Sequence, residues 1–150
     1  MRKRLVLIAL AVAVASVIVF GGPASAGKPG TGTLRVAELT GAEVVPTPGD
    51  LNGNGMGRFH FYPMKHKICY RVTVSGIQTA TKAHLHMGGA GEEGSSVKLN
   101  LLPPRNSARE CVRGLGERFI KKIAHNSSSY YVDVNNNEYP GGALRGQLTR

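Results

Sequence analysis

Short apolar segments separated by glycine, proline and asparagine make up most of this chain, and they constrain its fold more than any other feature. The 150 residues include 20 glycines and 8 prolines. Glycine and proline at this frequency disfavour long helices, and the pattern is typical of an all-β domain. The pattern predicts strands at residues 33–39, 58–62, 67–75, 83–87, 97–102, 108–112, 130–134 and 143–148.

The spacing of apolar side chains predicts the buried face of a strand, because successive side chains point to opposite faces. In segment 67–75, the residues that share the apolar face are Ile68, Tyr70, Val72 and Val74. In segment 33–39, Leu34 and Val36 share one face, with Glu38 as a further candidate for it. Residues 48–57, rich in glycine and asparagine, are predicted to form a loop.

One segment departs from the strand rhythm, between residues 115 and 124. Its apolar residues recur at helical spacing, and Glu117 lies four residues before Lys121. We expect a short helix that covers an open end of the fold. Eight short strands with one helical crossover predict a single β-sandwich of Greek-key type.

The N-terminus has the three parts of an export signal. The basic cluster Arg2–Arg4 precedes an apolar run from Leu5 to Phe20, and Ala24-Ser25-Ala26 follows. A membrane anchor is the alternative, but the run is shorter than the roughly 20 residues that span a bilayer. We predict cleavage after Ala26, which gives a signal peptide at residues 1–26, a flexible lead-in at 27–32 and one domain at 33–150.

The charge of the chain changes when this segment is removed. Three of the 19 basic residues precede the cleavage point and none of the 9 acidic ones does, so the net charge falls from +10 to +7. The remaining basic residues are scattered along the sequence, which predicts a solvated basic surface. Attraction to anionic polymers or lipids of the cell surface is the more specific alternative. No arginine-rich run alternates with aromatic residues, so we do not expect nucleic acid as a partner.

The two cysteines, Cys69 and Cys111, are predicted to form a structural disulfide. An isolated pair in a small exported domain usually bonds in an oxidising compartment. Reduced thiols that bind a metal are the alternative.

The segment Ala83–Gly88 is the strongest candidate for chemistry. On a strand, His84 and His86 point to one face while Leu85 points to the core. Imidazoles suit copper and zinc, but a stable site needs three or four ligands. Candidates for the rest are His60, His66, His125, Met87, Asp133 and Tyr131. The alternative is that both histidines hydrogen-bond the neighbouring glycine-rich segment and the last hairpin and so stabilise the fold.

Four motifs in order carry a resemblance to a known family. They are Leu39–Pro46, Ala83–Gly88, Tyr130–Val134 and Tyr139–Leu148. Together they resemble the CHRD domain, the module repeated in chordin and found singly in exported bacterial proteins, over about residues 34–148. The resemblance implies a β-rich extracellular module without an established enzymatic activity, and the cysteine pair resembles that of actinobacterial members.

The chain departs from this family at one position. Members commonly carry a histidine and a threonine after the strand at 130–134, where this chain has Asn135 and Asn136. If that histidine completes a metal site with the His-x-His pair, this chain lacks it.

The closing motif and the glycine-rich segment suggest structural roles. Gly141 and Gly142 allow a tight turn between the last two strands. Arg145 is expected to pair with a carboxylate such as Glu43 or Asp133, and an exposed ligand-binding arginine is the alternative. The glycines that we assign to the structural motif are Gly88, Gly142 and Gly146.

These observations predict a secreted, monomeric, non-catalytic module with a binding or structural role at the cell surface or extracellular matrix. Its ligand is unknown, and no cofactor is expected. The alternative is a copper- or zinc-binding protein that uses His84 and His86, for which superoxide dismutase is an analogy of fold only. A hydrolase is not expected, because the chain has no Gly-x-Ser-x-Gly motif and Asp50 and Asp133 have no evident Ser–His partner.

Overall fold

The computed structural model describes residues 32–95 and 97–150. The predicted signal peptide and nearly all of the predicted lead-in lie outside them. The strands are β1 (Thr33–Thr40), β2 (Asn54–Tyr62), β3 (Lys67–Ser75), β4 (Lys82–Met87), β5 (Val97–Leu101), β6 (Ser107–Arg113), β7 (Tyr130–Asn135) and β8 (Leu144–Gln147). The helices are α1 (Glu117–His125) and the short 3₁₀ turns η1 (Pro63–Lys65) and η2 (Ser127–Ser129).

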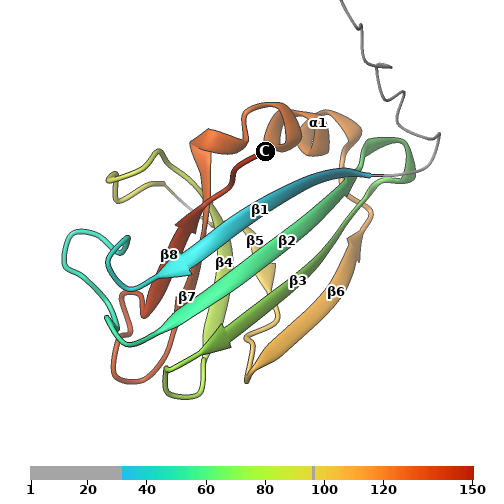
Figure 1. Ribbon diagram of the computed structural model, residues 1–150. Helices are drawn as coiled ribbons and strands as arrows, with labels where there is room; N and C mark the ends of the chain where they lie inside the picture. Colours follow the sequence, from blue (N-terminus) through green and yellow to red (C-terminus); the bar gives the residue numbers. More distant parts are fainter. Residues whose placement is uncertain (1–31, 96) are drawn as a thin grey trace, which may run out of the picture.

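All eight strands belong to one antiparallel sheet in the order β5-β4-β7-β8-β1-β2-β3-β6. The sheet folds over, so that the half made of β1, β2, β3 and β6 faces the half made of β8, β7, β4 and β5 (Figure 1). The fold turns between β8 and β1, whose only ladder pair is Thr40 with Arg145. The prediction of an all-β sandwich of eight short strands with one helical crossover is confirmed.

The core lies between the two halves and is closed at one end by α1. Phe59, Phe61, Ile68 and Leu85 are fully buried, and most other inward residues of their strands are buried as well. Helix α1 contributes Ile120, Ile123 and Ala124 to the core, and its Glu117–Lys121 ion pair lies at the surface. The predicted helix is therefore present and begins two residues later than expected. In the described ranges, no helix is long and apolar enough to cross a membrane.

Two predictions about the first strands are wrong. The inward residues of β1 are Ala37 and Leu39, whereas Leu34 is 44% exposed. The period was hidden because Arg35 also takes an inward position, where its guanidinium donates to the Ala124 carbonyl oxygen at the end of α1. Strand β2 begins inside the predicted loop 48–57, because residues 54–57 pair with both β1 and β3 despite their glycines.

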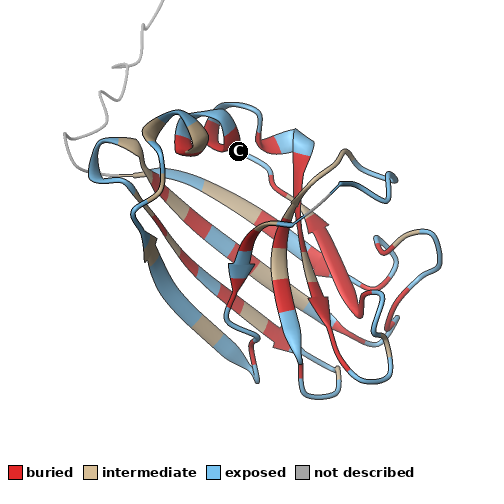
Figure 2. Ribbon diagram, turned by 180° about the vertical axis from the view of Figure 1, so that it is seen from behind, coloured by how far each residue is buried: buried red, intermediate tan, exposed pale blue. Residues whose placement is uncertain are grey.

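The strands that carry the candidate site are covered on both faces. Nearly every residue of β7 and β8 is buried, whereas edge strand β6 is exposed along most of its length (Figure 2). The inner face of β7 and β8 packs on the core. Their outer face is covered by residues 88–95, which we call the glycine-rich loop, through the hydrogen bonds described below.

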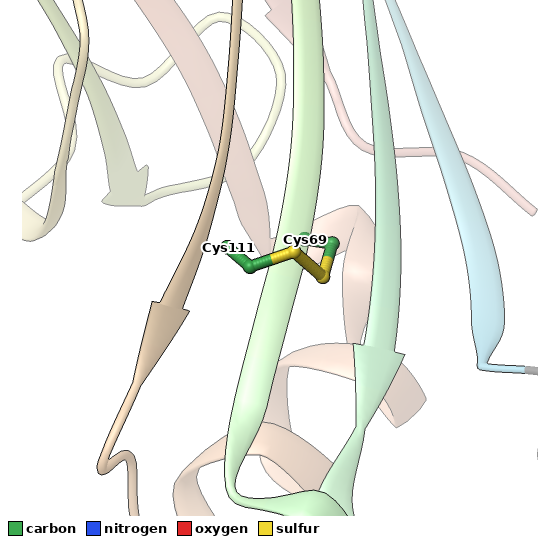
Figure 3. Close-up of a disulfide and its surroundings, with 2 residues drawn as sticks. All are labelled: Cys69 and Cys111. Atoms are coloured by element: carbon green, nitrogen blue, oxygen red, sulfur yellow. A yellow bond between two sulfur atoms is a disulfide. The ribbon is translucent and has the colours of Figure 1, made fainter.

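The predicted disulfide between Cys69 and Cys111 is present (Figure 3). The two residues are directly opposite each other on β3 and β6. This bond ties edge strand β6 to the rest of the sheet.

A candidate metal centre on the outer face of β4 and β7

Three potential ligands meet on the outer face of the sheet: His84, His86 and Asp133. His84 and His86 share one face of β4, while Leu85 between them is fully buried in the core. Antiparallel pairing with β7 puts Asp133 directly opposite His84. One ligand atom from each residue lies within 4.8 Å of the other two. Of the candidates weighed from the sequence, Asp133 is therefore the third member of the cluster.

The spacing of these atoms suits a tetrahedral ion. His84 Nδ1 lies 3.2 Å from Asp133 Oδ1, and His86 Nε2 lies 3.4 Å from the same oxygen. Zinc bonds of about 2.0–2.2 Å in a tetrahedron separate neighbouring ligand atoms by about 3.4 Å. Two of the three separations in the cluster therefore match such a site, and the third is within 4.8 Å.

The hydrogen bonding of His86 favours a cation at this point. His86 Nδ1 lies 3.0 Å from the Ser95 carbonyl oxygen, which can only accept, so Nδ1 carries the proton. In the neutral ring the lone pair is then on Nε2, and this buried atom has no hydrogen-bond partner among the described residues. A lone pair facing a carboxylate oxygen is unfavourable unless a proton or a metal ion lies between them. Backbone hydrogen bonds of this kind also orient histidines that bind metals.

The electrostatics of His86 agree with this geometry. The neighbouring Asp133 carboxylate is the largest cause that raises the pKa of His86, while burial acts in the opposite direction. The pocket thus stabilises positive charge at Nε2. Burial also raises the pKa of Tyr131, which stays neutral beside the cluster.

The side chains of Tyr131 and Arg145 stack beside His86 and support the cluster. The Tyr131 ring lies parallel to the His86 ring at 5.0 Å, and the Arg145 guanidinium lies 3.7 Å from the centre of the Tyr131 ring. Because β7 lies between β4 and β8, these two neighbours approach Tyr131 from opposite sides. This arrangement fixes the orientation of the His86 ring.

The same residues fasten the glycine-rich loop over the sheet. The Tyr131 hydroxyl donates to the Glu93 carbonyl oxygen, and Arg145 Nη2 donates to that of Gly89. The Gln147 side-chain amide donates to the Gly88 carbonyl oxygen. The loop therefore covers the cluster and leaves it half-buried.

Arg145 differs from its expected role. Its guanidinium forms an ion pair with neither Glu43 nor Asp133 in the described structure, and at 4% exposure it is not an exposed binding residue. Its partners are a tyrosine ring and a backbone carbonyl, which no sequence spacing identifies.

The other candidate ligands lie elsewhere. His66 and His125 contact the carbonyl oxygens of Leu115 and Lys121, and His60 lies on β2 in the other half of the sheet. Met87 packs against the core. Asn135 shares the outer face of β7, and its Nδ2 donates to the Pro140 carbonyl oxygen.

The three motif glycines lie at turns and at close approaches of the backbone. The Gly88 amide donates to the Ser129 carbonyl oxygen at the start of the glycine-rich loop. Gly142 has φ +143, a conformation that L side chains rarely adopt, in the turn before β8. Gly146 is buried where β8 approaches β1.

Fold and site together define an all-β, disulfide-bonded module that carries a His-His-Asp cluster under a loop. The sequence profile of the CHRD domain matches residues 35–148, which is most of the chain, so this protein belongs to the CHRD domain family. Among curated proteins and among solved structures, none matches the chain significantly.

Proposed function

We propose that this protein is an exported CHRD module that binds a divalent transition-metal ion, copper or zinc, at His84, His86 and Asp133. The observation that carries the proposal is the buried Nε2 of His86, which makes no hydrogen bond in the described structure and lies 3.4 Å from an Asp133 oxygen that His84 also contacts. Two imidazoles and one carboxylate form a donor set that both ions accept. The proposal takes up the alternative of a copper or zinc site, and the position of Asp133 beside both histidines supports it.

Export and a binding role at the cell surface are part of the same proposal. The three-part N-terminal pattern and a disulfide, which persists in oxidising compartments, support export. We propose binding rather than catalysis, and we expect the copper-loaded protein not to accelerate superoxide dismutation. Acceleration that disappears in the His84→Ala/His86→Ala variant would favour the enzyme alternative.

Titration of the mature, chelator-treated protein with Cu(II) and Zn(II) tests the metal site. We expect at least one ion to bind at neutral pH with a Kd tighter than about 10 μM. The double variant His84→Ala/His86→Ala should lose at least about 100-fold in affinity, since even residues that only orient ligands contribute 10–100-fold. Asp133→Asn, which keeps the shape of the side chain, should also weaken binding.

A matched control removes two imidazoles away from the cluster. The variant His60→Ala/His125→Ala should bind as tightly as the parent, because both residues lie on other elements. Two results would remove the proposal: a parent protein that binds neither ion more tightly than about 10 μM, or equal losses in the two double variants.

The affinity for metal should depend on pH in a defined direction. Protonated His86 cannot bind an ion, and its pKa is raised above 6.5, so protons compete already above that value. Below the raised pKa, we expect affinity to fall at least about tenfold per pH unit, because at least the His86 proton must leave for each ion bound. Titrations at several pH values measure this slope.

Without metal, the stability of the protein should have the opposite pH dependence. A raised pKa in the folded state stabilises the fold at low pH, and this contribution is lost as pH rises through the raised value. His86→Gln should remove that loss. A metal-free parent whose pH profile of unfolding equals that of His86→Gln would show that Asp133 does not act on His86.

A further inference from the structure

Pairing of the strands brings three arginines into a row on the outer face of the half-sheet opposite the metal centre. Arg58 on β2 is paired with Arg71 on β3, and Arg71 is paired with Arg109 on β6. All three are exposed, and their chain neighbours Phe59, Tyr70 and Val72 are buried on the inner face. We call these three residues the arginine row.

Without a binding partner, the arginine row would only destabilise the folded state. Like charges directly opposite each other on neighbouring strands are destabilising. Within the part of the chain that the structure describes, none of the three arginines forms an ion pair with a carboxylate. The cluster cannot be recognised from the sequence, because 13 and 38 residues separate its members along the chain.

The row borders an open hollow of about 560 Å³ that also includes the disulfide, His60, Tyr70 and Glu110. Glu110 is the one carboxylate among these lining residues, and it accepts a hydrogen bond from the Tyr70 hydroxyl. Three guanidinium groups against one carboxylate leave the hollow with an excess of positive charge. On the far side of the disulfide pair, Lys67 and Arg113 are opposite each other on the same face and extend the positive surface.

We propose that this face is a docking surface for a linear acidic polysaccharide. The charge is complementary, and the fork of a guanidinium matches carboxylate and sulfate groups with two parallel hydrogen bonds. Neighbouring strands are about 4.8 Å apart, so the row offers three such forks over about 10 Å, which suits an extended polyanion. The proposal does not depend on the metal site.

Two other polyanions fit this face less well. Single-stranded nucleic acid binds through aromatic rings on which bases stack. Of the two rings among the lining residues, that of Tyr70 is buried and packs on Phe59 at 5.8 Å, which leaves only the His60 ring for stacking. An anionic membrane is bound most firmly when apolar side chains insert as well. On this face, the disulfide pair is flanked by Arg71 with Arg109 and by Lys67 with Arg113. These pairs offer no large apolar side chain for insertion.

Binding to immobilised dextran sulfate in the presence of a metal chelator tests the proposal, with neutral dextran as the matched polymer. The chelator separates this test from the metal site. We expect binding to dextran sulfate and none to dextran. In the variant Arg58→Gln/Arg71→Gln/Arg109→Gln, affinity at about 50 mM salt should fall at least tenfold, and the slope of log K against log salt should become shallower by roughly two to three.

The control variant removes the same charge elsewhere: Lys82→Gln/Arg118→Gln/Lys122→Gln, at three exposed positions outside β2, β3 and β6. It should lose less than about threefold, since only long-range attraction is reduced. Thermal unfolding monitors folding, and the arginine-row variant should be no less stable than the parent because repulsion is relieved. The single change Arg109→Gln, on the exposed edge strand, should weaken binding in the same direction.

Three results would overturn the proposal. They are equal losses in the two triple variants, binding to neutral dextran as strong as to dextran sulfate, or tighter binding through the same arginines to phosphatidylglycerol vesicles or to a single-stranded oligonucleotide. The last result would assign the surface to a membrane or to nucleic acid instead.

Discussion

Replacing Gly146 by alanine should lower the free energy of unfolding by about 3 kcal/mol, the upper end of the usual cost of overpacking. A methyl group at this position would overlap the Glu38 carbonyl oxygen on β1 and lie 2.9 Å from Leu39 Cδ2. The obstacle is backbone at the point where the sheet folds over, so it cannot move like a side chain. Thermal unfolding should show a fall in Tm of about 10 °C.

Gly141→Ala is the matched control, from the same Pro-Gly-Gly-x-Leu-Arg-Gly motif. A methyl group there meets nothing within 4 Å, and the residue is exposed. We expect its stability to differ from that of the parent by no more than about 0.5 kcal/mol. Equal stabilities of the two alanine variants would mean that β8 and β1 are not in close contact.

Removing the disulfide should have the second large effect. Cys69 and Cys111 are 42 residues apart in the sequence, and a cross-link of this length stabilises the folded state by about 4 kcal/mol in the chain-entropy account. The variant Cys69→Ala/Cys111→Ala should therefore unfold at a much lower urea concentration. Edge strand β6 should lose hydrogen-exchange protection first, because its ladder to β3 is its only pairing in the described sheet.

Reduction of the parent protein provides the control for this prediction. A reductant should lower the urea midpoint of the parent to that of the variant and leave the variant unchanged. A variant that unfolds at the midpoint of the oxidised parent would show that the bond contributes no stability.

The sequence predicts those parts of the fold in which the period of apolar residues is clear. Strand β3 alternates without interruption, and its inner face was assigned correctly. Helix α1 also shows its period directly. Strand β1 does not show its period, because Arg35 takes an inward position. Its guanidinium donates a hydrogen bond to the carbonyl oxygen of Ala124 at the end of α1, 89 residues away in the sequence. Local patterns cannot reveal contacts of this kind.

The candidate site, too, could be predicted from the sequence only in part. The common face of His84 and His86 follows from the period of two in a strand. Choosing Asp133 from six candidate ligands requires the pairing of β4 with β7, and 49 residues separate Asp133 from His84. The arginine row and the packing of Arg145 on Tyr131 likewise depend on strand order. The sequence identifies the residue types that can bind a metal ion, but the strand order of the sheet decides which of them lie together.

The backbone bridge between Val36 and Thr149 has a consequence for how such a module can be joined to others. It brings the first strand and the last residues of the domain side by side, close to the end of the sheet that α1 covers (Figure 1). Entry and exit points that adjoin favour insertion into a surface loop of a host protein, because the host chain need not be stretched. A fusion that carries residues 33–150 within an exposed loop of a stable carrier should therefore leave both partners folded.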